Sequence, residues 1–425
     1  MDMKKPIYCS LAFGSASINS YGEYIPCCSI RTNHFEMFKD SFPNHPILNA
    51  RPSKRINASN LQSVRRELMK GEWPLACLNC KVAEDSGVSS MRMIWNRSIE
   101  VPMTDIVDPI NIKYLDLTFG TKCNSKCMTC NADLSDFWEE EWIAIHGSEN
   151  YVSRNRISIN GTNAQQLLED FPNVEFISLV GGEPTISEEH LLFLKLLIES
   201  GRSKNISLSY VTNLTGLTDE LLGYWEHFKA VNTCVSIDGY GKVNEYIRYP
   251  FKWSKTETNL KKYLELCQKN VGNMKYTLGL SCTLSMYNAI QAPDLLEYWY
   301  DTLKTYKTED GTLLKNVGAF INRVSFPVYA MVNNLPLPYR KQGIEKVDRL
   351  LAKIESEGLE VERGIIESIQ TIKSTLEEEW DMDMNRMKEA KHFIKTSDQF
   401  RNRDMKDYIP ELAEELEKIW KLMKL

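Results

Sequence analysis

The chain has 425 residues, 43% hydrophobic and 25% charged, which is the composition of a folded globular protein long enough for two or three domains. Its formal net charge of -6 at pH 7 argues against a nucleic-acid backbone as the main partner. The sequence has no apolar run long enough to span a membrane, and its start, MDMKKPIYCS, lacks the apolar stretch of a signal peptide; we therefore expect a cytoplasmic protein without a membrane partner.

Eleven cysteines, an odd number, favour metal or redox chemistry over a disulfide framework in a long chain without an export signal. Five of them come early in the chain: Cys9, Cys27, Cys28, Cys77 and Cys80. The run SLAFGSASINSYGEYIP alternates small and apolar residues and turns at Gly22, which predicts a β-hairpin that brings Cys9 and Cys27 together. With the C-x2-C pair, these two residues could complete a four-thiolate site, which suits a closed zinc or iron–sulfur centre.

A row of polar residues follows the C-x2-C pair in the pattern E-x2-G-x2-S-x-R-x3-N: Glu84, Gly87, Ser90, Arg92 and Asn96. The spacing predicts a helical connection, and we interpret the polar residues as a solvated helix face. Cys28 is left over from the four-thiolate site. For this cysteine, buried packing, a substitute ligand and a thiol that faces the active site all stay open.

The run TFGTKCNSKCMTC places Cys123, Cys127 and Cys130 at C-x3-C-x2-C spacing, directly after a strand-like stretch. Three thiolates in a short loop can hold one iron–sulfur cluster, because short loops cost little closure entropy and soft sulfur ligands suit iron. They are one too few for a four-iron cluster, so one iron would keep an open position for a substrate or cofactor. A zinc knuckle or a redox dithiol is the alternative.

Strand-like and helix-like stretches alternate through the central part of the chain. The predicted strands are residues 112–119, 174–180, 206–211, 230–237, 276–284 and 317–326. The predicted helices include residues 188–199, 219–228, 259–269 and 295–305. Such βα units in series predict a parallel sheet with right-handed crossovers, and they are too few to close the usual eight-stranded barrel.

The cysteine spacing after a strand resembles that of radical S-adenosylmethionine (SAM) enzymes, apart from Thr129, where that family usually carries an aromatic residue. Further motifs follow successive predicted strands in the family's order: Gly181, Gly182, Glu183 and Pro184 (GGEP), then Thr212 and Asn213, then Ser236 and Asp238 (SxDG) with Arg248 beyond. The resemblance implies that the GGEP turn holds the amino group of SAM and that the Thr-Asn step lies near its ribose. It also implies that Ser236 and Arg248 reach the SAM carboxylate; a surface ion pair is the alternative for Arg248.

For the fold, this resemblance implies a partial (β/α)6 TIM-like barrel of radical SAM type in residues 106–335, with its chemistry at the carboxyl ends of the strands. The open iron of a 4Fe-4S cluster would bind SAM. One electron, from a reductant such as flavodoxin or ferredoxin, would cleave SAM to methionine and a 5'-deoxyadenosyl radical. Because that radical abstracts hydrogen from a substrate, the implied enzyme is a radical SAM oxidoreductase.

The early cysteines resemble an auxiliary-cluster module of the twitch or SPASM type. Its cysteine–glycine–cysteine spacing is matched by Cys9, Gly22 and Cys27, and Cys77 with Cys80 supplies the later pair. The resemblance implies a second 4Fe-4S cluster in residues 1–105. Here the module precedes the core motif, whereas the family usually places it after, and a structural zinc site is the alternative.

Residues 336–425 are strongly charged with helical periodicity, which predicts a helical C-terminal segment. Its apolar stripes are Ile365, Ile369, Ile372 and Leu376, and, after Pro410, Leu412, Leu416, Ile419 and Met423. A stripe of this kind usually packs on the protein's own core; it could instead bind a partner protein or a second copy of this chain.

Three functions fit these motifs. The first is oxidation or cross-linking of a peptide or natural-product precursor, with the auxiliary cluster as electron acceptor. The second is a small-molecule enzyme, either a sugar or alcohol dehydrogenase or a redox-neutral epimerase in which Cys28 returns a hydrogen atom. The third, from a different class, is a zinc-stabilised scaffold protein without SAM turnover.

Overall fold

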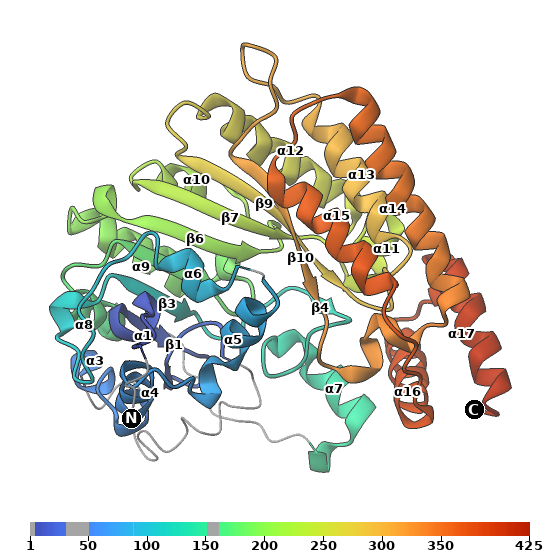
Figure 1. The fold of residues 1–425 in the computed structure, drawn as a ribbon, viewed down its shortest axis with the longest axis horizontal. Helices are drawn as coiled ribbons and strands as arrows, with labels where there is room; N and C mark the ends of the chain where they lie inside the picture. Colours follow the sequence, from blue (N-terminus) through green and yellow to red (C-terminus); the bar gives the residue numbers. More distant parts are fainter. Residues whose placement is uncertain (1–4, 31–50, 88, 151–160) are drawn as a thin grey trace. The chain divides into compact units, whose positions relative to one another are not determined.

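The structure, a computed structural model, describes residues 5–30, 51–87, 89–150 and 161–425. Its helices and mostly parallel strands form two units, which we describe one at a time (Figure 1). The first consists of Met1–Lys122, Ser153–Tyr210 and Thr218–Ala230, and the second of Cys123–Val152, Val211–Leu217 and Val231–Leu425. The α/β class expected from the sequence is confirmed. The division into residues 1–105, 106–335 and 336–425 stays a prediction.

Among the described residues of the first unit, five strands form the sheet: β1 Ser15–Ile18, β2 Tyr24–Ile25, β3 Tyr114–Thr118, β5 Phe176–Val180 and β6 Ser207–Thr212. Their order is β6-β5-β3-β1-β2, and all neighbours are parallel except the hairpin pair β1–β2. Gly22 lies in the hairpin turn with a φ of 74°, a left-handed conformation that glycine adopts without strain. The predicted hairpin is therefore confirmed.

One face of this sheet is apolar and packs against helices. Its fully buried side chains include Leu115, Leu117, Ile177 and Leu179. Tyr210 shares this face through its pairing with Leu179, and its hydroxyl lies 2.8 Å from Nε2 of His190 and 3.0 Å from Nε1 of Trp225. Because His190 belongs to α9 (Glu188–Glu199) and Trp225 ends α10 (Asp219–Trp225), these contacts fix two crossover helices on the sheet.

The other helices in the described part of the first unit are short: α1 Ser10–Gly14, α3 Pro52–Arg55, α4 Ser59–Met69, α5 Leu78–Asp85, α6 Met91–Trp95 and α8 Gly161–Asp170. Helix α1 corrects the prediction that the hairpin begins immediately after Cys9. All five residues of α1 are buried, so side chains on every side of this run are small or apolar. Such a run carries no periodicity that would separate a helix from a strand.

In the described part of the second unit, the sheet has three parallel strands in the order β10-β9-β7: β7 Ala230–Ser236, β9 Tyr276–Leu284 and β10 Val317–Arg323. A separate antiparallel pair joins β4 Lys126–Cys127 to β8 Arg248–Tyr249. The helices between these strands are α7 Glu139–His146, α11 Lys242–Ile247, α12 Trp253–Lys269 and α13 Ala292–Leu303. Strand β10 ends before the predicted residue 326 because Arg323 pairs with Leu284, the last residue of β9.

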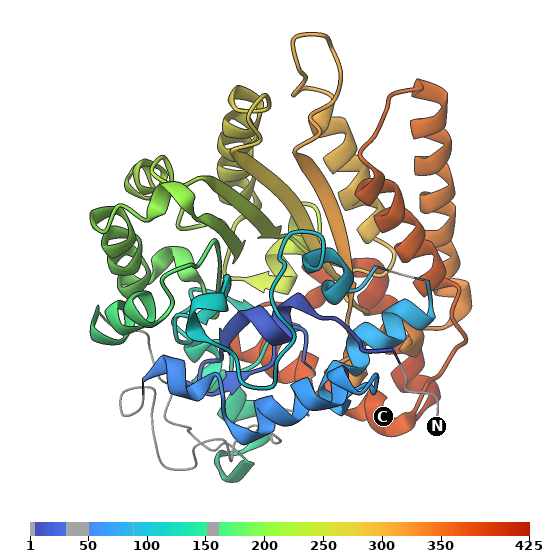
Figure 2. The ribbon, with the colours of Figure 1, turned by 60° about the vertical axis from the view of Figure 1, so that its left-hand side comes forward.

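The C-terminal segment of the second unit is helical, as predicted: α14 Leu337–Glu357, α15 Arg363–Leu376, α16 Met384–Phe400 and α17 Pro410–Leu422. The Ile365–Leu376 stripe is buried, and α15 lies along β10 (Figure 1 and Figure 2). There, Oγ of Ser368 donates a 2.9 Å hydrogen bond to O of Ala319. This helix therefore covers the outer edge of the sheet. Within the described ranges, no helix has the length and apolar character that crossing a membrane requires.

Candidate functional site

A hollow in the first unit is lined by four cysteines: Cys9, Cys27, Cys77 and Cys80. The empty space there, open solvent included, is about 370 Å³. Apolar side chains, among them Leu68 and Trp73, form much of the remaining wall. The sequence predicts that these four residues meet, and in the first unit they line the same hollow.

Short elements bring the four cysteines to the hollow. Cys9 directly precedes α1, and the β1–β2 hairpin returns the chain to Cys27. Cys77 ends a short 3-10 helix, Leu75–Cys77, and Cys80 lies in the first turn of α5. The C-x2-C pair therefore lies at the start of a helix. Because its two cysteines are three residues apart, close to one helical turn, both side chains face the hairpin residues.

The close approach of these thiols affects their pKa values. Burial, with a smaller contribution from the charge of Cys80, raises the pKa of Cys9 to about 11. Burial, with the charges of Cys28, Cys9 and Cys77, raises the pKa of Cys27, and burial with Cys9 and Cys80 raises that of Cys77. Four thiolates here repel one another, so a cationic centre is needed before they ionise together.

This donor set fits a four-cysteine iron–sulfur cluster, whose ligands surround a centre wider than one ion. In the described part of the chain, no three His, Cys, Asp or Glu side chains converge on a single metal ion. No disulfide joins any of the eleven cysteines, all of which the structure describes.

The polar row after the C-x2-C pair is not a solvated helix face, which corrects the prediction. The side chains of Glu84 and Arg92 are only 17% and 19% exposed, and they form an ion pair. Ser90 caps α6 by accepting from N of Met93, and its Oγ donates to Oε1 of Glu84 at 2.6 Å. The spacing was visible in the sequence, but the burial of these side chains was not.

Cys28 lies outside the four-cysteine hollow and beside the polar face of the first unit's sheet. Its side chain is solvent-exposed, yet surrounding protein and the charge of Asp116 raise the pKa of its thiol, which Tyr114 contacts. On the sheet, Asp116 lies in register between Ser17 of β1 and Ser178 of β5. These surroundings therefore disfavour the thiolate form of Cys28.

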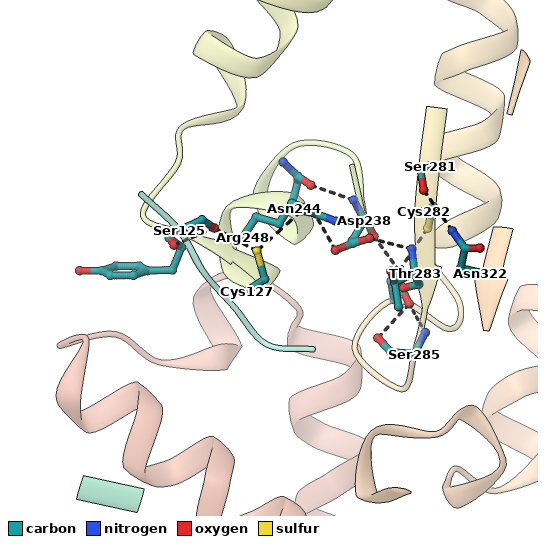
Figure 3. Close-up of polar contacts among 12 residues, drawn as sticks. Ser125, Cys127, Asp238, Asn244, Arg248, Ser281, Cys282, Thr283, Ser285 and Asn322 are labelled. Atoms are coloured by element: carbon teal, nitrogen blue, oxygen red, sulfur yellow. Dashed lines mark hydrogen bonds and ion pairs between the residues drawn. The ribbon is translucent and has the colours of Figure 1, made fainter. Parts of the chain in front are cut away.

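The C-x3-C-x2-C loop belongs to the second unit, where Cys127 is held on two sides (Figure 3). Oγ of Ser125 lies 3.0 Å from Sγ of Cys127, and Nη1 of Arg248 donates to the same sulfur at 3.7 Å. Cys127 also pairs with Arg248 between β4 and β8. N of Cys123 donates to Oδ1 of Asp136 at 3.1 Å, and N of Cys130 donates to O of Cys127 at 3.0 Å.

Asp238 fixes the guanidinium of Arg248 (Figure 3). Its Oδ2 lies 2.8 Å from Nε of Arg248, and its Oδ1 accepts from N of Thr283 at 2.7 Å. Burial opposes the charge of Arg248, but Asp238 and Cys127 outweigh it and raise the pKa of the guanidinium. Arg248 is thus in a buried ion pair and not the surface pair weighed from the sequence. Ser236, at the end of β7, pairs with Ser281 of β9.

The Thr-Asn step contacts the cysteine loop within the second unit. Nδ2 of Asn213 donates to Oδ1 of Asn124 at 2.9 Å, and Nδ2 of Asn124 donates to Oγ1 of Thr215 at 2.9 Å. Oγ1 of Thr212 accepts from N of Leu214 at 2.8 Å. Because Asn124 directly follows Cys123, the Thr-Asn step helps to fix the conformation of the loop.

The GGEP turn in the first unit requires both of its glycines. Gly181 and Gly182 have φ values of 89° and 47°, and a Cβ on Gly182 would lie 2.2 Å from O of Lys122. N of Glu183 donates to that same carbonyl at 2.9 Å, and Oε1 of Glu183 accepts from N of Thr185 at 3.1 Å. Pro184 starts a 3-10 turn. The turn therefore lies against the backbone that leads into Cys123.

Two arginines near the C-terminus also contact the cysteine loop, which sequence reasoning missed. Nη1 of Arg401 and Nη2 of Arg403 each lie 3.4 Å from Sδ of Met128. Arg401 also pairs with Glu141 of α7 at 2.9 Å, both side chains being fully buried. No local pattern links these residues to the loop, because they are far apart along the chain.

No protein-family model and no curated protein matches this sequence. Among solved structures, SuiB of Streptococcus suis bound to S-adenosylmethionine is 12% identical, with a TM-score of 0.34 over 59% of this chain and 49% of that one. SuiB bound to the precursor peptide SuiA is 12% identical, with a TM-score of 0.37 over 77% and 59%. Native anSMEcpe with bound AdoMet is 15% identical, with a TM-score of 0.39 over 59% and 63%. This chain thus spans less than two thirds of each of them, and TM-scores this low assign neither fold nor activity.

Proposed function

We propose that this chain is a radical SAM enzyme that forms a 5'-deoxyadenosyl radical and abstracts hydrogen from its substrate. The observation that carries the proposal is the arrangement around the C-x3-C-x2-C loop, in which Arg248 contacts Cys127 and Asn213 contacts Asn124. Motifs from separate strand ends thus act on one loop. A bare zinc knuckle or redox dithiol gives no reason for these contacts.

The loop offers three thiol donors, which fits a 4Fe-4S cluster with one open iron. When bound, that cluster and SAM would supply the radical. Arg248 and Ser125 act on Cys127, since their polar groups point at its sulfur and would stabilise its thiolate. We assign Ser236 and Arg248 to the SAM carboxylate, Gly181–Pro184 to its amino group, and Thr212 with Asn213 to its ribose; these assignments rest on the sequence resemblance. Asp238 belongs to the same SAM site and holds the guanidinium of Arg248.

The fold we propose for residues 106–335 is the partial (β/α)6 barrel. Two features support it: each unit contributes three parallel strands, β3, β5 and β6 in the first and β7, β9 and β10 in the second, and helices follow the strands along the chain. Such strands collect polar motifs at their carboxyl ends, where Asn213 and Asp238 follow β6 and β7.

We further propose that the four-cysteine hollow is a twitch-like auxiliary 4Fe-4S site and that the enzyme oxidises or cross-links a peptide or natural-product precursor. A substrate radical that becomes an oxidised product must lose one electron and one proton. Four thiol donors with no open position suit a cluster that accepts this electron without binding substrate.

A redox-neutral epimerase, the second candidate, is favoured by one observation. The Cys28 thiol is solvent-exposed, and its raised pKa favours the protonated thiol. A thiol must carry that hydrogen to return it to a substrate radical. The product of a deuterated substrate separates the two candidates, because only the epimerase gives back a hydrogen atom.

Partners follow from this chemistry. The substrate is a peptide or a small molecule such as a sugar or alcohol, and the reductant is of the flavodoxin or ferredoxin kind. We propose a cytoplasmic setting for this reaction, since both kinds of cluster need protection from oxidation.

The first test counts iron and acid-labile sulfide after anaerobic reconstitution. We expect roughly eight irons per wild-type chain, from two four-iron clusters. Replacing Cys123, Cys127 and Cys130 by Ala should leave about four, and replacing Cys9, Cys27, Cys77 and Cys80 by Ala should also leave about four.

The control for this count is Cys234→Ala, a half-buried cysteine of β7 that belongs to neither set. It should keep the wild-type iron content. Zinc in place of iron in the wild-type protein would reject the proposed function and leave the zinc-stabilised scaffold.

A further inference from the structure

Arg92 lies in the wall of the four-cysteine hollow. Among the described residues that line the hollow, it is the one charged side chain; the others are cysteines, apolar residues, a serine and an asparagine. A guanidinium in the wall of a sulfur-lined hollow is not needed to hold metal, because it cannot be a ligand. Its position therefore calls for another explanation.

The side chain is held in place by several contacts. Nε of Arg92 donates to Oε1 of Glu84 at 2.9 Å, and Nη1 donates to O of Tyr8 at 2.6 Å. The guanidinium carbon lies 5.5 Å from the centre of the Trp73 ring. Hydrogen bonding to Glu84 raises the pKa of Arg92, so the charge persists in its partly buried position.

The same network reaches the segments that carry the cysteines. Tyr8 and Ser10 flank Cys9, and Asn96 binds both: its Nδ2 donates to O of Tyr8 at 3.1 Å and its Oδ1 accepts from N of Ser10 at 2.8 Å. Glu84 lies on α5, one turn beyond Cys80. Arg92 is thus fixed relative to cysteines from both halves of the site, which a mobile surface arginine would not be.

A positive charge in this place has a definite electrochemical effect. A cluster bound by four thiolates is an anion, and it gains one more negative charge when it is reduced. A fixed cation beside it stabilises the reduced form more than the oxidised form, most strongly where water is scarce. The charge of Arg92 also favours the thiolates of Cys9 and Cys77 in the hollow.

We infer that Arg92 is a positioning residue that raises the reduction potential of the cluster bound by Cys9, Cys27, Cys77 and Cys80, so that this cluster accepts an electron from the substrate radical. In that step the substrate radical loses one electron to the cluster and one proton to water, and the cluster is reduced. This inference rests on the proposed function.

The experiment uses the Cys123, Cys127, Cys130→Ala protein, in which only the four-cysteine cluster can form. Its midpoint potential is measured by anaerobic redox titration followed by electron paramagnetic resonance, before and after Arg92→Met. We expect a shift to more negative potential with Arg92→Met and a much smaller shift with Arg92→Lys, which keeps the charge.

Lys81→Met is the matched control. Like Arg92, Lys81 is a cation, and it lies on α5 next to Cys80. Its side chain is 38% exposed, pairs with Asp85 and does not line the hollow. Its removal should leave the potential unchanged, because solvent screens an exposed charge. Iron content and thermal unfolding are recorded for every variant.

An unchanged potential in Arg92→Met with full iron content would overturn the inference and leave the proposed function intact. Equal shifts of the midpoint potential in Lys81→Met and Arg92→Met would also overturn it. Loss of iron from a folded Arg92→Lys protein would overturn it as well, because it indicates a role in cluster assembly. A parent protein with no iron in this site would reject the auxiliary cluster itself.

Discussion

Asp116 is a buried carboxyl group in the first unit. It is 5% exposed in the middle of β3, and its Oδ1 has no hydrogen-bond partner among the described residues. Burial raises its pKa to about 6, although Ser178 and Ser17 lower it in part. A raised pKa means that the folded protein favours the protonated acid, so ionisation at neutral pH works against folding.

The first prediction concerns Asp116→Asn. Because the pKa is about 6 in the folded chain and about 3.9 when unfolded, stability present at low pH is lost as the pH rises through 6. Asp116→Asn should therefore raise the free energy of unfolding at pH 8 by about 1–3 kcal/mol, and the difference should vanish near pH 4. Chemical denaturation at both pH values measures this.

The control is Asp85→Asn, whose carboxylate is 61% exposed. It should change stability little at either pH. If Asp116→Asn destabilises the protein at pH 8, the carboxylate has a stabilising partner and our account of Asp116 is wrong.

The second prediction compares two glycines with positive φ. Gly182→Ala places a Cβ 2.2 Å from the Lys122 carbonyl oxygen. Gly201 has a φ of 70°, but a Cβ added there would have no neighbouring atom within 4 Å. Gly201→Ala should cost only about 1 kcal/mol of backbone strain, and Gly182→Ala should cost several times more. Equal losses in urea unfolding would show that the close approach at the GGEP turn does not matter.

At the scale of elements, the loop between α16 and α17 carries the arginines that hold α7 and the cysteine loop in the second unit. Arg401 and Glu141 form a fully buried ion pair, and Lys126 lies 3.6 Å from the same carboxylate. Removing one partner of a buried pair leaves an uncompensated charge, which is costlier than removing both.

The third prediction follows from this pair. Arg401→Met should destabilise the protein by about 3 kcal/mol, because Lys126 still compensates part of the charge of Glu141. The double variant Arg401→Met, Glu141→Gln should recover most of that loss. If the double variant is as unstable as the sum of the two single variants, the pair is not coupled and this view of the contact fails.

Elements with a strong local pattern were predictable from the sequence. Strand β9 and helix α9 have the predicted ends, since alternation and helical periodicity are clear there. Helix α12 starts earlier than predicted, at Trp253, because its first turns are polar and show little periodicity. The pairing of β1 with β3 was missed, since contacts between distant strands leave no local signal.

At the scale of the whole chain, some residues of the candidate site could be predicted from local sequence and others could not. Cysteine spacings are local, so both cysteine sets could be named in advance. The Glu84–Arg92 pair had visible spacing but was misread, because its burial depends on Tyr8 and Trp73, which no spacing reveals. Arg401 and Arg403 could not be predicted at all, since only folding brings them to Met128.

The fourth prediction is that the two cysteine sets serve separable functions, because each set lies within one unit. The variant lacking Cys9, Cys27, Cys77 and Cys80 should still cleave SAM. It should fail to form the oxidised product once a substrate is supplied. Loss of both activities in a folded, iron-containing variant would contradict this separation.

The most direct test of the central claim is the formation of 5'-deoxyadenosine from SAM by the anaerobically reconstituted protein after reduction with dithionite. We expect product from the wild-type chain and from the Cys234→Ala control, and none from the Cys123, Cys127, Cys130→Ala variant. A wild-type protein that holds its iron and leaves SAM intact would contradict the proposal that this chain is a radical SAM enzyme.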